Sequence, residues 1–167
     1  MIRGIAGLSA PSLDDIRWID ADGSERAPLA LSELGAGFKL LFFFQHWCRG
    51  CHAHGFPTLV ALTRSLARSP VGFAAVQTVF ERADENGFER LRENQVKYEL
   101  NIPFGHAAAT PGKHVPAVME AYRTGGTPWF VVIAPDGAVV HDGFELHADI
   151  LAQTLSALAS GDAAETK

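Results

Sequence analysis

Both cysteines of this chain lie in one short segment, residues 45 to 55, with the sequence QHWCRGCHAHG. Cys48 and Cys51 are separated by two residues, a spacing that can close a disulfide or bind a metal ion. His52 extends the motif to CxxCH, the pattern of covalent haem attachment, and His54 adds another candidate zinc ligand. The segment therefore admits three kinds of chemistry: a redox pair, a haem attachment site or a metal site.

The elements expected around this segment place the two cysteines at the start of a helix. Residues 38 to 44 (FKLLFFF) are apolar on both faces, which predicts a central strand covered by helices on each side. From residue 51 to about residue 68, apolar residues recur at three- and four-residue steps, which predicts an amphipathic helix that Pro57 bends early. Cys48 then ends a loop, and Cys51 lies in the first helical turn.

This placement favours dithiol chemistry. A thiolate at a helix N-terminus faces unpaired N–H groups and the positive end of the helix dipole, which lowers its pKa. Arg49, between the two cysteines, adds a positive charge that acts in the same direction. Cys48 is therefore expected to be exposed and nucleophilic, and Cys51, one turn further on, can resolve a mixed disulfide.

Three alternatives stay open beside the redox pair. A haem requires that His52 turn outward toward iron, although this residue is expected in a helix that packs on the sheet. A zinc site usually takes four ligands from two separate segments, whereas all candidates here come from one short span. In the third alternative, the cysteines are simply two small side chains buried in the core.

The remaining pattern predicts a single α/β domain over residues 1–160, followed by a flexible tail over residues 161–167. Buried strands alternate with helices, and a closing hairpin turns at Pro135-Asp136-Gly137. The other expected elements are two extended pieces around Asp22-Gly23, a strand over residues 71–80, a helix capped by Asn86 and running to about Tyr98, a short strand near residue 103, a short helix from Pro116 and a last helix over residues 147–159 ending near Gly161.

The composition limits which kinds of molecule this chain can be expected to bind. The chain has 167 residues, a net charge of −5 and 47% hydrophobic residues, which is enough for one well-packed domain. Its Lys and Arg residues are scattered, and its longest apolar run is too short to cross a bilayer, so neither a nucleic acid nor a membrane is expected as a partner. The N-terminal residues show no secretory h-region, which predicts a cytoplasmic protein, or a periplasmic one if a leader was removed.

The segments FFFQHWCRGC and GGTPWFVVIAPDGAVV together resemble the thioredoxin superfamily, and more narrowly the TlpA-like thiol–disulfide oxidoreductases related to the redoxin and AhpC/TSA proteins. The resemblance implies a three-layer α/β/α sandwich with a mixed central sheet, extra N-terminal strands and a helix-strand insertion between about residues 81 and 106. It implies that Cys48 is the attacking nucleophile, that Cys51 is the resolving thiol and that Trp47 shields one side of the pair. Pro128, preceded by Thr127, resembles the cis-proline of the family.

The chain departs from the family pattern in two places. Many thioredoxins carry a buried Asp on the strand before the motif, and Phe42 occupies about that place here. Glu81 resembles in position a buried acid of the TlpA-like branch, with His46 and His52 as rival proton carriers. The dipeptide between the cysteines is Arg-Gly rather than Gly-Pro, which predicts a less reducing potential than that of typical thioredoxin.

The sequence therefore predicts a thiol–disulfide oxidoreductase that needs no organic cofactor and no metal. Its partners would be a protein or small-molecule thiol or disulfide and an external redox protein. A thiol-dependent peroxidase is one alternative, although Leu41 and Gln45 stand where peroxiredoxin relatives carry Pro and Thr. A non-enzymatic metal- or haem-binding module is the other alternative. The remaining histidines are interpreted as structural: His106, His114, His141 and His147.

Overall fold

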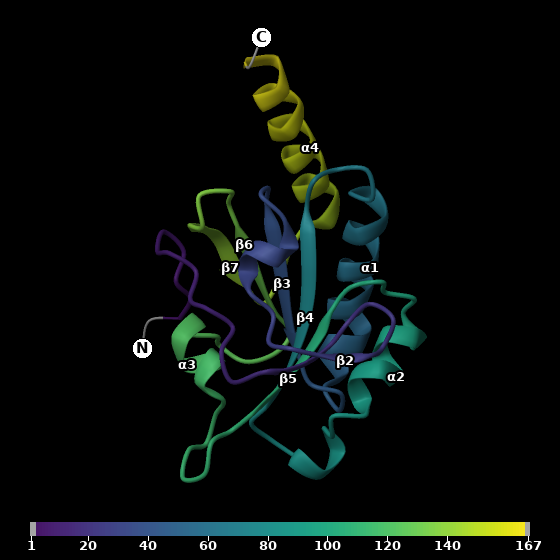
Figure 1. The fold of residues 1–167 in the computed structure, drawn as a ribbon, viewed down its shortest axis with the longest axis vertical. Coiled ribbons are helices and arrows are strands. Elements are labelled where there is room, and N and C mark those ends of the chain that lie inside the picture. Colours follow the sequence, from purple (N-terminus) through teal and green to yellow (C-terminus); the bar gives the residue numbers. More distant parts are fainter. Residues whose placement is uncertain (1–2, 166–167) are drawn as a thin grey trace.

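The computed structural model describes residues 3–165 as a seven-stranded mixed sheet with helices on both faces (Figure 1). The order of strands across the sheet is β2-β1-β5-β4-β3-β6-β7. The strands are β1 (Arg17–Ile19), β2 (Glu25–Arg26), β3 (Lys39–Phe44), β4 (Gly72–Val79), β5 (Phe104–Ala108), β6 (Trp129–Ile133) and β7 (Val139–Gly143). The helices are η1 (Leu31–Leu34), η2 (Cys51–Gly55), α1 (Phe56–Ser65), η3 (Ala83–Glu85), α2 (Arg90–Lys97), α3 (Ala117–Tyr122) and α4 (Ala148–Glu165).

Strand β3 lies at the centre of the sheet, and every one of its six residues is buried. It pairs in parallel with β4 and antiparallel with β6, so that Phe42 lies beside Ala75 on one side and Phe130 on the other. Parallel neighbours need a crossover, and α1 and α2 provide those between β3, β4 and β5. The N-terminal hairpin β1–β2 extends the sheet by pairing β1 antiparallel with β5.

Alternate residues of β3 enter two separate cores because successive side chains of a strand point to opposite faces. Phe42 and Phe44 belong to the core that α1, α2 and α4 cover. Leu41 and Phe43 belong to the core that α3 and the N-terminal segment cover. The helices therefore lie on both sides of the sheet (Figure 1), and the predicted three-layer α/β/α sandwich is confirmed.

The helix that carries the CxxC motif is irregular in its early turns, because Arg49 and Gly50 are α-helical but the next residues are not. Residues Cys51–Gly55 form a π-helical turn, in which the Phe56 N–H donates to the Cys51 carbonyl. Pro57 then lies at the beginning of α1, where its missing N–H costs no helical hydrogen bond. The predicted single bent helix is therefore a wide turn followed by a helix.

Two predicted helix ends are wrong. Asn86 does not cap α2, because that helix begins at Arg90 and its N-cap is Glu89, with no side-chain cap. The last helix continues to Glu165 instead of ending near Gly161. One glycine costs a helix only about 1 kcal/mol relative to alanine, which the alanine-rich neighbours of Gly161 can offset.

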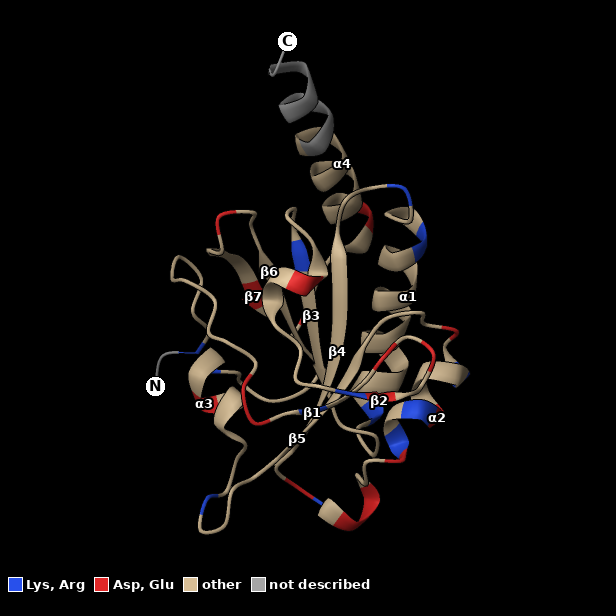
Figure 2. Cartoon of the chain, viewed as in Figure 1, with Lys and Arg blue, Asp and Glu red and all other residues tan. Residues whose placement is uncertain are grey.

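The charged side chains are spread over many elements of the described chain, with acidic and basic residues interspersed (Figure 2). Among residues 3–165, no helix combines the length and the hydropathy that a membrane crossing demands.

Candidate active site

The two cysteines lie at the carboxyl end of the central strand. Cys48 follows the short loop after β3, and Cys51 opens the π-helical turn. The Thr127–Pro128 peptide is cis, as the resemblance implied, and it leads into β6, the antiparallel neighbour of β3. The fold thereby brings together two segments far apart in sequence, and the Cys48 Sγ lies 3.7 Å from the Thr127 carbonyl oxygen.

The environment of Cys48 stabilises its thiolate. Both cysteines are free thiols, and Cys48 is 9% exposed, less than the sequence predicted. Its pKa falls to about 5, chiefly because the Cys51 thiol donates a hydrogen bond to it, which outweighs the cost of burial. The backbone N–H groups of Cys51 and Gly50 and the side chain of Thr127 lower it further. Cys48 is therefore a thiolate at neutral pH.

The pKa of Cys51 is shifted in the opposite direction. Its side chain is fully buried, and this burial raises the pKa of the Cys51 thiol well above its ordinary value. The hydrogen bond that it donates to Cys48, and the negative charge of the Cys48 thiolate, raise it further. The pair thus consists of an ionised sulfur near the surface and a protonated sulfur behind it, which are the properties of a nucleophile and a resolving thiol.

Trp47 precedes Cys48 directly, and Arg49 lies between the two cysteines in the sequence. Arg49 is exposed and is not among the groups that lower the pKa of Cys48, so the predicted effect of its charge is not found. A solvated guanidinium is screened by water, whereas hydrogen bonds to the sulfur act directly. Trp47 is half-buried, and the Arg82 guanidinium carbon lies 4.6 Å from its ring centroid.

His52 connects the first turns of the helix to the loop before Cys48 by a hydrogen bond. Its Nε2 lies 2.6 Å from the His46 carbonyl oxygen, and its Nδ1 lies 2.5 Å from the Tyr98 hydroxyl. Both ring nitrogens are thus engaged inside the protein, which argues against the outward turn that haem ligation requires. Among residues 3–165, no three His, Cys, Asp or Glu side chains are arranged to hold a metal ion.

Glu81 does not fit the role of a buried acid. Its side chain is exposed, and its backbone N–H donates to Gln45 Oε1 at 3.3 Å. The position of Glu81 resembles that of a buried acid of the TlpA-like branch, but its carboxylate is on the surface, the alternative that the sequence left open. The reason is that β4 ends at Val79, so Glu81 already belongs to a surface turn.

Asn86 is a site residue that the sequence analysis assigned to the wrong role. Its Oδ1 accepts from the His46 N–H at 2.7 Å, and its Nδ2 donates to the carbonyls of Glu81 and Arg82, both at 3.0 Å. The side chain is buried and joins the η3 loop to the loop that carries Cys48. Nothing in the local sequence distinguishes this tether from a helix cap, because Asn is common in both.

Gly55 permits the helix to approach the sheet beneath the cysteines. A Cβ at this position would lie 2.7 Å from the Phe42 ring and 3.0 Å from Pro128 Cβ. We expect Gly55→Ala to destabilise the protein by about 1–3 kcal/mol, because the buried ring and the loop must move apart. Urea unfolding of the reduced protein measures this effect.

Gly50→Ala is the matched control for this substitution. A Cβ at Gly50 meets only Pro128 Cδ, at 3.4 Å. The free energy of unfolding of Gly50→Ala should therefore stay within about 0.5 kcal/mol of that of the native protein. Equal losses in the two variants would contradict the packing that we assign to Gly55.

Solved structures of similar shape share this architecture. A thioredoxin-like superfamily protein matches with a TM-score of 0.78 and 24% identity, covering 91% of this chain and 96% of its own. A thiol-disulfide isomerase from Corynebacterium glutamicum matches with a TM-score of 0.75 and 25% identity, covering 90% and 97%. A thioredoxin-family thiol:disulfide interchange protein from Chlorobium tepidum matches with a TM-score of 0.62 and 19% identity, covering 95% and 98%.

Scans against protein-family models and against curated proteins give no match. The structural matches nevertheless cover most of this chain and most of each neighbour. The resemblance drawn from the sequence is confirmed at the level of the fold: this chain has a thioredoxin-like fold, and its structural neighbours are thioredoxin-like proteins and thiol–disulfide oxidoreductases.

Proposed function

We propose that this protein is a thiol–disulfide oxidoreductase of TlpA-like type that exchanges disulfides through Cys48 and Cys51. The opposite shifts of the two thiol pKa values, in a pair that faces a cis-proline loop, carry this proposal. The names of the neighbours, a thiol-disulfide isomerase and a thiol:disulfide interchange protein, support the same class of reaction.

The reaction follows from the two protonation states. The Cys48 thiolate attacks one sulfur of a substrate disulfide, forming a mixed disulfide and expelling the other substrate sulfur as a thiolate. Cys51 then loses its proton and attacks Cys48 Sγ, which releases the first substrate sulfur and closes an intramolecular disulfide. Two electrons pass from the protein to the substrate, and the two expelled thiolates take up protons from Cys51 and from water.

The other groups around the pair position it and its substrate. The Thr127 carbonyl lies beside Cys48, and we expect Trp47, which precedes Cys48 and is half-buried, to shield one side of the pair, as the resemblance implies. No organic cofactor enters the reaction, because the electrons reside in the thiols themselves. An external dithiol or disulfide must reset the pair after each turnover, and the step runs in either direction according to that partner.

A single-turnover experiment tests the proposal. Protein reduced beforehand and freed of reductant is mixed with an equimolar protein disulfide such as that of insulin. We expect one substrate disulfide to be reduced per protein molecule, while Cys48 and Cys51 become joined and resist alkylation, as peptide mapping by mass spectrometry would show. An unchanged substrate, with both cysteines still open to alkylation after unfolding, would refute the function.

A further inference from the structure

A hollow of about 700 Å³ lies next to the cis-proline loop. Its lining residues are Arg3, Val115, Met119, Glu120, Arg123, Thr124 and Gly125. Thr124 and Gly125 belong to the segment that continues to Thr127, whose carbonyl oxygen lies beside the Cys48 sulfur. Three residues of chain span at most about 10 Å, so the hollow begins within about that distance of Thr127.

The two arginines that line this hollow are not paired with acidic side chains. Arg3 and Arg123 form no ion pair with any residue between 3 and 165, although the whole chain is acidic, with a net charge of −5. Among residues 3–165, Glu120 is the only acidic residue in the lining. The Thr124 hydroxyl has no hydrogen-bond partner within the described part of the chain, but it is shielded from solvent, so it is not open to a ligand in the hollow. The two guanidinium groups alone match the donor needs of a carboxylate.

An aromatic ring lies beside the segment that joins the hollow to Thr127. Phe144 packs against Gly125, since a Cβ on Gly125 would lie 2.8 Å from the Phe144 ring. Phe144 is 40% exposed, and the Arg3 guanidinium carbon lies 5.9 Å from its ring centroid. A bound chain that reaches the two arginines would therefore also contact this ring.

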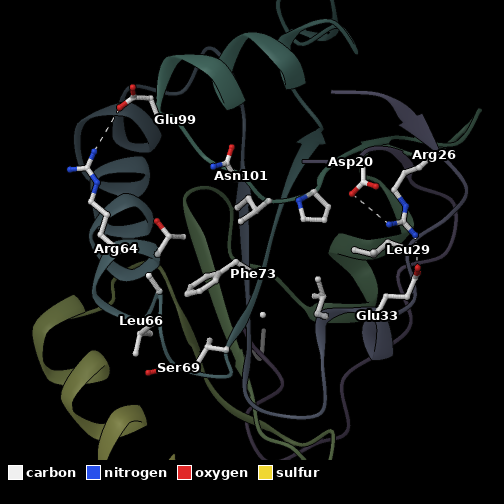
Figure 3. Close-up of a pocket in the computed structure, with 17 residues that line it drawn as sticks. Asp20, Arg26, Leu29, Glu33, Arg64, Leu66, Ser69, Phe73, Glu99 and Asn101 are labelled. Carbon is white, nitrogen blue, oxygen red and sulfur yellow. Dashed lines mark hydrogen bonds and ion pairs between the residues drawn. The ribbon is translucent and has the colours of Figure 1, made fainter. Parts of the chain in front are cut away.

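A second hollow differs from the first in the pairing of its arginines. It has a volume of about 660 Å³ and lies at the other end of α1, away from the cysteines (Figure 3). Its two arginines already have acidic partners: Arg64 pairs with Glu99 at 3.9 Å, and Arg26 pairs with Glu33 at 2.6 Å. The arginines of this second hollow are thus already paired with acidic side chains, whereas Arg3 and Arg123 have no acidic partner within the described residues.

We propose that Arg3 and Arg123, which we call the anion pocket, select disulfide substrates that carry a carboxylate about three residues from the reacting cysteine. This inference rests on the proposed function, because it names the substrate class of the same site. The exchange is the one described above: the Cys48 thiolate bonds to the substrate cysteine sulfur, and the other sulfur of the substrate leaves as a thiolate.

Short peptides with blocked termini test the anion pocket. Each contains one cysteine, joined as a mixed disulfide to 2-thiopyridine, and carries Glu, Gln or Lys three residues before or after it. Release of 2-thiopyridone reports the attack by Cys48 on the peptide sulfur. We expect the Glu peptide to react at least about fivefold faster than the Lys peptide at low salt, in one of the two placements. This ratio should shrink as salt is added.

Substitutions assign the preference to the pocket. In the double variant Arg3→Gln/Arg123→Gln, the Glu-to-Lys ratio should fall to about one, while the rate with the uncharged Gln peptide stays within about twofold of the native rate. Glu120→Gln should raise the ratio, because it removes an acidic residue of the lining. The control Arg64→Gln/Arg68→Gln changes the net charge equally at the far end of α1 and should leave the ratio unchanged.

The outcomes separate this inference from the proposed function. If all native reactions proceed without charge preference, or if the preference survives in Arg3→Gln/Arg123→Gln, the anion pocket is refuted and the oxidoreductase function stands. If the reduced protein reacts with none of the peptides, the proposed function fails and the substrate class falls with it.

Discussion

Cys51→Ser is expected to turn the protein into a trap that stops at a stable mixed disulfide with its substrate. Cys48 can still attack, because a serine hydroxyl also donates a hydrogen bond and partly replaces the thiol that is the main cause of the low pKa of Cys48. The second step cannot follow, since a hydroxyl does not displace a disulfide sulfur. Non-reducing electrophoresis and intact mass measurement would detect the trapped adduct, and tandem mass spectrometry would identify the substrate.

Two further variants control this experiment. Cys48→Ser should lose at least about 10³-fold in disulfide reduction and trap nothing, because it removes the nucleophile. Cys51→Ala should trap substrate more slowly than Cys51→Ser at pH 6, because it leaves the Cys48 sulfur without its main donor and so raises its pKa. Turnover by Cys51→Ser at the native rate, or an adduct on Cys48→Ser, would show that the roles are assigned wrongly.

The second large effect is the pH dependence of Cys48 alkylation. In the reduced native protein, the alkylation rate should rise with a midpoint near pH 5, where the pKa of Cys48 lies, and stay level above about pH 7. An ordinary cysteine titrates near pH 8.5, so only about 1% of it is thiolate at pH 6.5. Cys51 should stay unmodified while the protein is folded. A midpoint near 8.5 for Cys48 would contradict the thiolate environment described above.

The same pKa sets how stability depends on pH. Cys48 has a folded pKa of about 5 against an ordinary value of 9.0, so the stability it contributes is fully present above pH 9 and is lost as the pH falls to 5. Between these limits, the reduced protein should gain up to about 1.4 kcal/mol per pH unit relative to the oxidised protein, which has no thiolate. Urea unfolding of both forms at pH 7 and 8.5 measures this difference.

A stabilised thiolate also makes the reduced protein a weaker reductant. At pH 7, about two units above the pKa of Cys48, the reduced form gains on the order of 3 kcal/mol, which corresponds to roughly 60 mV for a two-electron couple. The potential should therefore be less negative than about −270 mV, the value of thioredoxin, as the Arg-Gly dipeptide also predicted. The cause, however, lies in hydrogen bonds to the sulfur rather than in Arg49.

Strongly patterned segments made the core of this fold predictable. The continuous apolar run of β3 indicated a strand buried on both faces, and the Pro135-Asp136-Gly137 turn marked the hairpin between β6 and β7. The resemblance placed Pro128 as a cis-proline, which the structure contains. These features depend on local chemistry or on well-defined motifs, so they could be recognised without knowledge of the packing.

Features that arise from packing between distant segments were not predictable in this way. Asn86 was expected to cap a helix but instead bonds to His46, because its side chain finds backbone groups that only the folded loop provides. For Glu81 the sequence left both a buried and a surface role open, and the end of β4 at Val79 leaves it on the surface. The anion pocket joins Arg3 to Arg123 across most of the chain, and no periodicity links such positions.

The aromatic ring beneath the cysteines has a consequence for the timing of catalysis. Phe42 packs against Phe56 and Phe130, with ring centroids 5.0 and 5.1 Å away, in the same apolar core as Cys51. The largest causes of the raised pKa of Cys51 include no carboxylate of the described residues. Cys51 is itself fully buried, so we expect its proton to reach solvent or the departing substrate sulfur by way of the mixed disulfide at Cys48. A small substrate leaves this mixed disulfide open to water, whereas a large one shields it, so the lifetime of the covalent complex should grow with the size of the substrate.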